Sequence, residues 1–142
     1  MYEPYVRMSL PSARYRELLG TAIYVFNSNN SFIIELLLKN EKSINNWHSL
    51  IDKNTITIVK KAKETFQSRE YITNLFVEII SIRNRIIHSF GITAPYDILG
   101  DNQVLSTKYK DGRQQIIDEN FLLDFIKKNE ALSDLLHDLR GH

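Results

Sequence analysis

The spacing of hydrophobic residues along the chain predicts a mostly helical protein. Apolar side chains recur at intervals of three and four residues in four long stretches, and this interval places them on one face of an α-helix. The stretches cover residues 12–39, 55–66, 69–90 and 118–140. A shorter segment with the same spacing surrounds Trp47. We therefore expect an all-α fold, an antiparallel bundle of about four main helices that forms a single domain over residues 1–142.

Capping residues stand at the expected ends of these helices. Ser12 and Asp118 have side chains that can accept a hydrogen bond from the first free N–H groups of a helix, so they should cap the first and the last helix. Gly91 and Gly141 follow the central and the last helix, and glycine readily takes the left-handed conformation in which many helices end.

The first apolar stretch contains a polar interruption, the run NSNNS at residues 27–31. This run is compatible with a break between two helices, in which Ser31 would cap the second one. It is equally compatible with the polar face of one helix whose buried amides find partners. Because the apolar spacing continues on both sides as far as Lys39, we expect one long helix.

The region before the last helix has a different sequence pattern, typical of a loop and short strands. Residues 92–101 contain the last proline and read as a loop. Residues 104–110 and 113–117 read as two short strands, joined by Asp111-Gly112, a pair that suits a two-residue turn with positive φ values. We expect a small β-hairpin here, inserted before the last helix and too poor in apolar residues to be a core sheet.

The composition is that of a soluble globular protein. Of the 142 residues, 43% are hydrophobic and 25% are charged, and no apolar run approaches the length that spans a bilayer. The first residues lack the basic start and apolar segment of a secretory signal, so we expect a cytoplasmic protein. The absence of cysteine excludes disulfides, thiolate zinc sites and thiol nucleophiles.

The charge distribution bears on possible partners. The formal net charge of +1 argues against a protein that coats nucleic acid without specificity. Residues 1–90 carry twelve Lys or Arg against eight Asp or Glu, whereas residues 91–142 carry six against nine. Lys60, Lys61 and Lys63 form a basic outer face on the helix of residues 55–66, which is compatible with simple solvation or with contact to a phosphate backbone.

The stretch that starts at Tyr71 and ends at Phe90, YITNLFVEIISIRNRIIHSF, contains an arginine, an asparagine and a histidine within an otherwise apolar helix. On a helical wheel, Arg83 lies at the centre of the apolar stripe. Because arginine keeps its charge, its burial requires a partner. Either a carboxylate such as Glu78 pairs with Arg83, or Arg83 faces a cleft that an anion enters. The stripe itself comprises Ile72, Phe76, Ile79, Ile86, Ile87 and Phe90.

Asn84 and His88 are candidate site residues beside Arg83. They are four residues apart and so lie on adjacent turns of one helix face, where the amide can orient the imidazole or share a ligand with it. Arg83 lies about 140° around the helix from His88, so the two side chains do not converge within one chain. A second copy across a twofold axis would bring them together. Arg85 lies opposite the stripe, and we expect a surface residue there.

Other catalytic patterns are missing from the sequence. It has no glycine-rich phosphate loop, no nucleophile elbow and no two histidines at metal-ligand spacing on one helix face. We therefore expect neither a cofactor site nor a metal site.

The motif formed by Arg83, Asn84 and His88, in RNRIIH, resembles the R-x(4–6)-H signature of the HEPN superfamily. These are small helical-bundle domains with the motif near the end of a core helix. The resemblance covers most of the chain in size, helix order and motif placement, and the motif is its residue-level match. Catalytic members are metal-independent endoribonucleases with a composite site at a homodimer interface, and they act as toxins or effectors in prokaryotic defence.

The resemblance implies a role for each motif residue. His88 would relay protons around the attack of the ribose 2′-hydroxyl, Arg83 would stabilise charge on the scissile phosphate, and Asn84 would position either of them. The implied partners are an RNA substrate, a second copy that docks through residues 71–90, and, for a toxin, a cognate antitoxin.

One position departs from the toxin members that pair with a nucleotidyltransferase antitoxin. Those toxins carry a tyrosine two places after the histidine, where AMP is attached, whereas this chain has Phe90. Phe90 has no hydroxyl to modify. The alternative within the superfamily is a noncatalytic module for dimerisation, RNA binding or partner binding.

Overall fold

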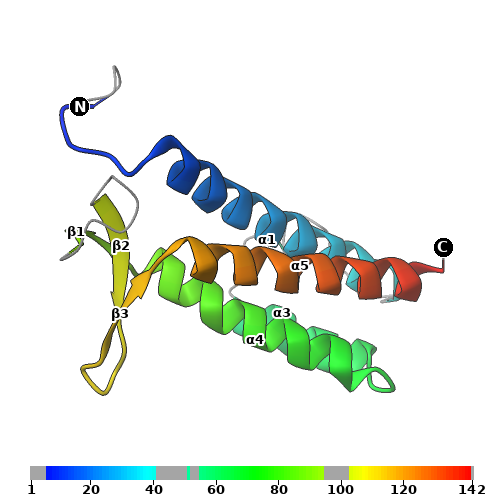
Figure 1. The fold of residues 1–142 in the computed structure, drawn as a ribbon. Helices are drawn as coiled ribbons and strands as arrows, with labels where there is room; N and C mark the ends of the chain where they lie inside the picture. The colour runs from blue at the N-terminus through cyan, green and yellow to red at the C-terminus, as the bar shows by residue number, and fades with distance from the viewer. Residues whose placement is uncertain (1–5, 41–50, 52–54, 95–102, 142) are drawn as a thin grey trace.

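The computed structural model describes residues 6–40, 51, 55–94 and 103–141 of the chain. Within these residues the protein is mostly helical, with four helices and a small sheet between the last two of them in the sequence (Figure 1). The helices are α1 (Ala13–Asn40), α3 (Thr55–Thr65), α4 (Glu70–Ile87) and α5 (Glu119–Arg140). The predicted helical bundle is confirmed. Trp47, the expected centre of a short extra helix, lies outside the described residues.

Both predicted N-caps are confirmed. The Ser12 hydroxyl accepts a hydrogen bond from the backbone N–H of Tyr15 at 3.1 Å, and the Asp118 carboxylate accepts one from the N–H of Phe121 at 2.8 Å. At the other end of α5, Gly141 has a φ of 94°, as expected for a left-handed C-cap.

The polar run in the middle of α1 does not interrupt the helix, because its inward-facing amide is satisfied by α5. Asn29 is buried, and its Nδ2 donates to the backbone carbonyl of Asn129 at 2.8 Å and to the Asn129 side-chain oxygen at 3.1 Å. Asn129 in turn donates to the carbonyl of Phe125 at 3.0 Å. The prediction of one long helix is therefore confirmed, with a buried amide pair that joins α1 to α5.

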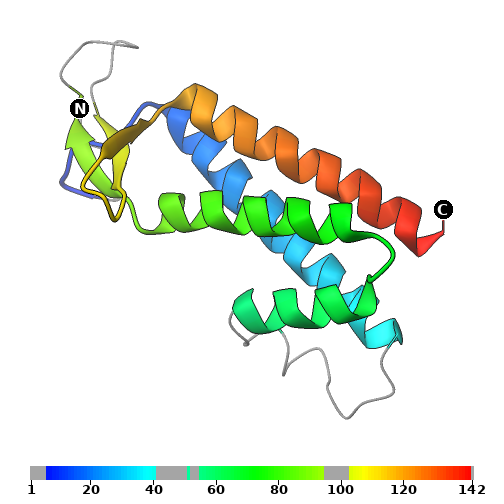
Figure 2. The same ribbon diagram turned by 90° about the horizontal axis from the view of Figure 1, so that it is seen from below.

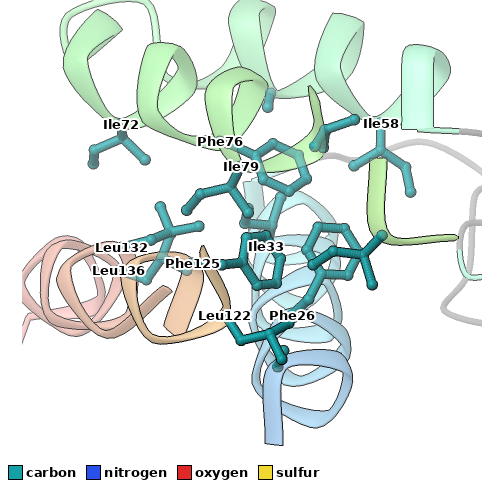
Figure 3. Close-up of a cluster of buried hydrophobic side chains, with 14 of the residues drawn as sticks. Phe26, Ile33, Ile58, Ile72, Phe76, Ile79, Leu122, Phe125, Leu132 and Leu136 are labelled. Carbon is teal, nitrogen blue, oxygen red and sulfur yellow. The ribbon is translucent and has the colours of Figure 1, made fainter. Parts of the chain in front are cut away.

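The core lies where α1, α4 and α5 face one another, with α3 covering one side of α1 and α4 (Figure 2). Phe26 of α1 stacks on Phe125 of α5, with ring centroids 6.4 Å apart. Figure 3 shows side chains from all four helices meeting in this region. The labelled members are Phe26, Ile33, Ile58, Ile72, Phe76, Ile79, Leu122, Phe125, Leu132 and Leu136, all of them buried.

The sheet has three antiparallel strands in the order β1-β2-β3. They are β1 (Phe90–Thr93), β2 (Gln103–Lys108) and β3 (Gln114–Ile117). The predicted hairpin of β2 and β3 is confirmed, but the prediction of a helix continuing to Phe90 is wrong. The helix α4 ends at Ile87, and Phe90 pairs with Ser106 in β2.

The expected left-handed stop at Gly91 is also wrong, because Gly91 lies in β1 without a positive φ. Two physical reasons favour the strand. The segment FGIT contains a glycine, which is a poor helix former, and two β-branched residues. In addition, the strand gains ladder hydrogen bonds with β2.

The turn between β2 and β3 is longer than predicted. Gly112 has a φ of 89°, but Asp111 does not, because no non-glycine residue among those described has a positive φ. The N–H of Gly112 donates to the carbonyl of Tyr109 at 2.9 Å, and the N–H of Tyr109 donates to the carbonyl of Arg113 at 2.8 Å. The connection is thus a four-residue turn, residues 109–112, whose last residue is the left-handed Gly112, instead of a two-residue primed turn.

Tyr15 attaches the sheet to the helical bundle. Its side chain is 1% exposed, and its hydroxyl donates to the carbonyl of Ile117 at 2.6 Å while accepting from the N–H of Leu105 at 3.1 Å. The pKa of the Tyr15 hydroxyl is raised, chiefly because burial disfavours the phenolate. This one side chain connects α1 to β2 and β3, and so holds the sheet at the end of the bundle where α4 finishes (Figure 1).

Some apolar residues of the predicted helical stretches, among them Ile56, Ile87 and Phe90, lie outside the core. In α3, Ile58 and Ala62 are buried, but Ile56 is 73% exposed. At the end of α4, Ile87 and Phe90 are 52% and 43% exposed. For Phe90 the reason is the change from helix to strand, which removes it from the periodicity on which the prediction rested.

Candidate functional site

The three predicted site residues lie in the last two turns of α4, next to the sheet. Arg83 and Asn84 are half-buried, and His88 is exposed. His88 is the C-cap of α4, and its backbone N–H donates to the carbonyl of Asn84 at 2.9 Å. The imidazole is therefore carried by a residue that still belongs to the helical hydrogen-bond pattern, although the next residues leave the helix.

Arg83 has no carboxylate partner among the described residues. Its guanidinium carbon lies 4.9 Å from the centroid of the Phe26 ring, and its Nε is buried without a hydrogen-bond partner. Burial lowers the pKa of this guanidinium. Glu78, the carboxylate considered in the sequence analysis, instead binds Lys128 of α5 at 2.9 Å.

An aromatic face attracts a cation by about 0.5–2 kcal/mol, which offsets only part of the cost of withdrawing a charge from water. Of the two alternatives left open by the sequence, pairing of Arg83 with Glu78 is wrong, because Glu78 binds Lys128. The Arg83 guanidinium is held by packing on Phe26 and keeps hydrogen-bonding capacity that no described residue uses.

Asn84 and His88 share one face of α4. They are separated by one helical turn, about 6 Å along the axis and about 40° around it. The exposed imidazole has two ring nitrogens that can donate or accept hydrogen bonds, and the adjacent amide can also donate and accept them. This face can therefore hold a polar ligand and exchange a proton with it.

Within one chain, Arg83 and His88 do not meet. Arg83 contacts Phe26 of α1, on the inner side of α4, whereas His88 faces solvent. The structure thus brings together Asn84 and His88 and leaves Arg83 on another side of the helix. Convergence of all three in a dimer stays a prediction.

Arg85, expected as a surface residue, is partly buried and contacts the hairpin. Its Nη1 donates to the backbone carbonyl of Lys108 at 2.9 Å, and its guanidinium carbon lies 5.7 Å from the centroid of the Tyr109 ring. Arg85 is three residues before His88, so the two side chains are neighbours on the helix surface. The spacing of Arg85 and His88 in the sequence already indicates that these two side chains are neighbours. The contact between Arg85 and the hairpin could not be inferred from that spacing.

The face that bears Asn84 and His88 also carries exposed apolar residues. Val77, 41% exposed, lies within about 20° of both on the helical wheel. Next to it, a groove of about 310 Å³ lies between α4 and α3 and is lined by Ile56, Val59 and Ile80 among others. Asn84 follows Ile80 by one helical turn, so exposed apolar and polar side chains are neighbours along this side of α4.

Two further properties concern the described residues as a whole. In that part of the chain no three His, Cys, Asp or Glu side chains gather as a metal ion would require. None of the described helices combines the length and apolar character needed to cross a membrane.

Comparison of the chain with protein-family models, with curated proteins and with solved structures gave no match.

Proposed function

We propose that the protein is a metal-independent endoribonuclease of the HEPN type, which acts as a homodimer and uses Arg83, Asn84 and His88. The observation that carries this proposal is the state of Arg83, a half-buried cation with an unused Nε and no carboxylate partner among the described residues. A charge kept in such a position costs stability unless an anion uses it. A phosphate group is the anion that arginine binds best in a fixed geometry.

The proposed chemistry follows from the residue types. His88 acts as a general base that takes the proton of the attacking ribose 2′-hydroxyl. The protonated imidazole then acts as a general acid that gives a proton to the leaving oxygen. Arg83 stabilises the negative charge that develops on the phosphate, and Asn84 orients the imidazole or the phosphate. Because the nucleophile belongs to RNA, the product ends in a 2′,3′-cyclic phosphate and DNA is not cleaved.

The dimer is part of the proposal because one chain keeps Arg83 and His88 apart. Two copies of α4 that face each other across a twofold axis place the Arg83 of one copy near the His88 of the other. The exposed apolar residues Val77 and Ile87 support this interface, since they lie near the same face and would be covered. As a toxin or defence effector, the enzyme would be held inactive by a cognate antitoxin until needed.

The test is cleavage of purified tRNA and mRNA in the presence of EDTA, with the product ends analysed by mass spectrometry. Removing a general acid–base group lowers the rate by about 10²–10⁴-fold, so His88→Ala should lose nearly all cleavage. Arg83→Ala should lose a comparable amount. The matched control is His137→Ala, which removes an exposed histidine of α5. Equal cleavage by the parent and both site variants would refute the site.

A noncatalytic interaction module is the second candidate, and the contact between Arg83 and Phe26 favours it. That contact gives Arg83 a structural role that needs no substrate. In this case no RNA is cleaved, and Arg83→Ala lowers the melting temperature or the dimer fraction in analytical ultracentrifugation. The two candidates are separated by cleavage activity alone, measured on protein shown to be folded.

A further inference from the structure

The hairpin next to His88 carries a cluster of basic side chains built around Tyr109. The guanidinium carbon of Arg113 lies 4.3 Å from the Tyr109 ring centroid, and that of Arg85 lies 5.7 Å from it. The Tyr109 hydroxyl is itself held by a hydrogen bond to the side-chain oxygen of Gln115. Because the ring is held in this way, it orients two arginines that come from different elements, α4 and the β2–β3 turn.

This cluster is far more positive than the chain as a whole. The basic hairpin surface, as we name it, comprises Arg85, Lys108, Tyr109, Lys110 and Arg113. Its four cations and the adjacent Asp111 sum to +3, whereas the entire chain carries only +1, so the remainder of the chain is net negative. Asp111 lies 4.0 Å from the Arg113 guanidinium, in an exposed pair too weak to neutralise it.

The position of the surface connects it to the candidate site. Arg85 binds the carbonyl of Lys108, the last residue of β2, and Arg85 and His88 lie on adjacent turns of α4. The register that pairs Phe90 with Ser106 also directs β2 past the end of α4 at His88. The basic hairpin surface therefore begins within one side-chain length of the imidazole.

A purely structural explanation accounts for only part of this arrangement. The hydrogen bond from Arg85 fixes the hairpin to the helix, and that role needs one arginine. The exposed side chains of Lys108, Lys110 and Arg113 are not needed for the turn, which is held by backbone hydrogen bonds and by Gly112. Four cations placed together against mutual repulsion are instead typical of a surface that binds an extended anion.

We propose that the basic hairpin surface binds the phosphate backbone of single-stranded RNA on one side of the scissile bond and guides it to His88. This inference rests on the proposed function and specifies which part of the molecule holds the substrate. Guanidinium groups oriented by an aromatic ring present their N–H edges to phosphate oxygens in a fixed geometry. The Tyr109 ring is occupied by arginines, so it does not serve as a stacking platform for bases, and binding depends little on sequence.

The test measures binding without cleavage. A fluorescent 2′-O-methyl RNA of about 20 nucleotides lacks the 2′-hydroxyl nucleophile, and its anisotropy reports binding to the intact protein. Lys110→Gln combined with Arg113→Gln should weaken binding at least tenfold, and should reduce the slope of log affinity against log salt by about 1.4, because each lost phosphate contact removes about 0.7 for a single strand.

The matched control also removes two positive charges. Lys60→Gln combined with Lys63→Gln alters exposed lysines of α3 that line the groove beside Val77 and Ile80, two helical turns or more before His88, so affinity should change less than twofold. If the two double variants weaken binding equally, only net charge matters and the proposal is overturned. A larger loss in the α3 variant overturns it as well, since the strand would then follow α3.

Failure of this inference can be told apart from failure of the proposed function. If the parent cleaves RNA, and the hairpin variant binds and cleaves like the parent, the basic hairpin surface is not the substrate site although the protein is a ribonuclease. If the parent binds RNA through the hairpin but cleaves nothing, RNA binding by the basic hairpin surface is supported and the ribonuclease proposal fails. If the parent does not bind RNA, the proposal that the basic hairpin surface binds RNA is overturned.

Discussion

Replacement of Tyr15 by phenylalanine isolates the contribution of one hydroxyl to the junction between the sheet and the bundle. The change removes a donor to the carbonyl of Ile117 and an acceptor for the N–H of Leu105, while the buried ring remains. A buried backbone group left without a partner costs about 1–3 kcal/mol. With two such groups affected, we expect Tyr15→Phe to lower the free energy of unfolding by about 2–4 kcal/mol.

The assay is urea denaturation followed by circular dichroism, together with amide hydrogen exchange. Since 1 kcal/mol corresponds to a shift of about 2–4 °C in a protein slightly larger than this one, the melting temperature should fall by on the order of 10 °C. Exchange of the Leu105 amide should accelerate more than exchange of amides in the middle of α5. The control is Tyr71→Phe, at a tyrosine that is 56% exposed, where a change within about 0.5 kcal/mol is expected.

The same hydroxyl predicts a pH dependence. Burial raises the pKa of Tyr15 in the folded protein above its ordinary value of 10.0, which applies in the unfolded chain. The unfolded state then loses its proton at a lower pH than the folded state, so stability is fully present below pH 10 and declines as the pH rises through the folded pKa. This part of the alkaline loss should be missing in Tyr15→Phe. A stability within 0.5 kcal/mol of the parent, with no change in Leu105 exchange, would refute the role assigned to this hydroxyl.

Further substitutions test three separate parts of the structure. Asn29→Ala should lower the free energy of unfolding by about 1–3 kcal/mol, because it removes the donor to the buried side-chain oxygen of Asn129. A double-mutant cycle with Asn129→Ala should reveal coupling above about 0.5 kcal/mol, and additive losses would contradict the amide pair. Gly112→Ala should destabilise the protein by about 1 kcal/mol, because the φ of Gly112 is 89°. Gly20→Ala in α1 should stabilise it by up to about 1 kcal/mol, because an added methyl meets nothing within 4 Å there. Both changes are measured in thermal melts. In urea denaturation, the free energy of unfolding of Arg83→Met should stay within about 1 kcal/mol of that of the parent, since the lost attraction to Phe26 is offset by removal of an unpaired charge. The same variant should lose cleavage. A larger loss of stability would favour the purely structural role of Arg83.

Local patterns in the sequence were sufficient for the helices. The periodicity of apolar residues and the side chains of Ser12 and Asp118 involve neighbours within a few positions, and they predicted α1, α3, α5 and most of α4 correctly. The strand β1 was missed because its stability depends on β2, which begins ten residues after β1 ends. A helical wheel carried past Ile87 could not include that competitor, and it therefore kept Phe90 in the helix.

The candidate site, too, could be predicted from the sequence only in its local features. The motif of Arg83, Asn84 and His88 lies within six residues, so its existence and the separation of Arg83 from His88 follow from helix geometry. Contacts from distant segments could not be inferred. The ring under Arg83 comes from Phe26, and the neighbours of Arg85 come from the β2–β3 turn. Charge counts along the chain even pointed away from that turn, because it lies in the more acidic half of the sequence.

The tyrosine that joins α1 to β3 has a consequence for the order of events during synthesis. It connects residues 102 positions apart, and the core under α4 is completed by Leu122, Phe125 and Leu132 of α5. A nascent chain emerges from the ribosome with its N-terminal end first, so the whole motif is exposed long before the elements that hold it are available. On this basis, the partly made protein has residues 83–88 without the contacts that position them, and these contacts form only after translation of the chain has passed α5.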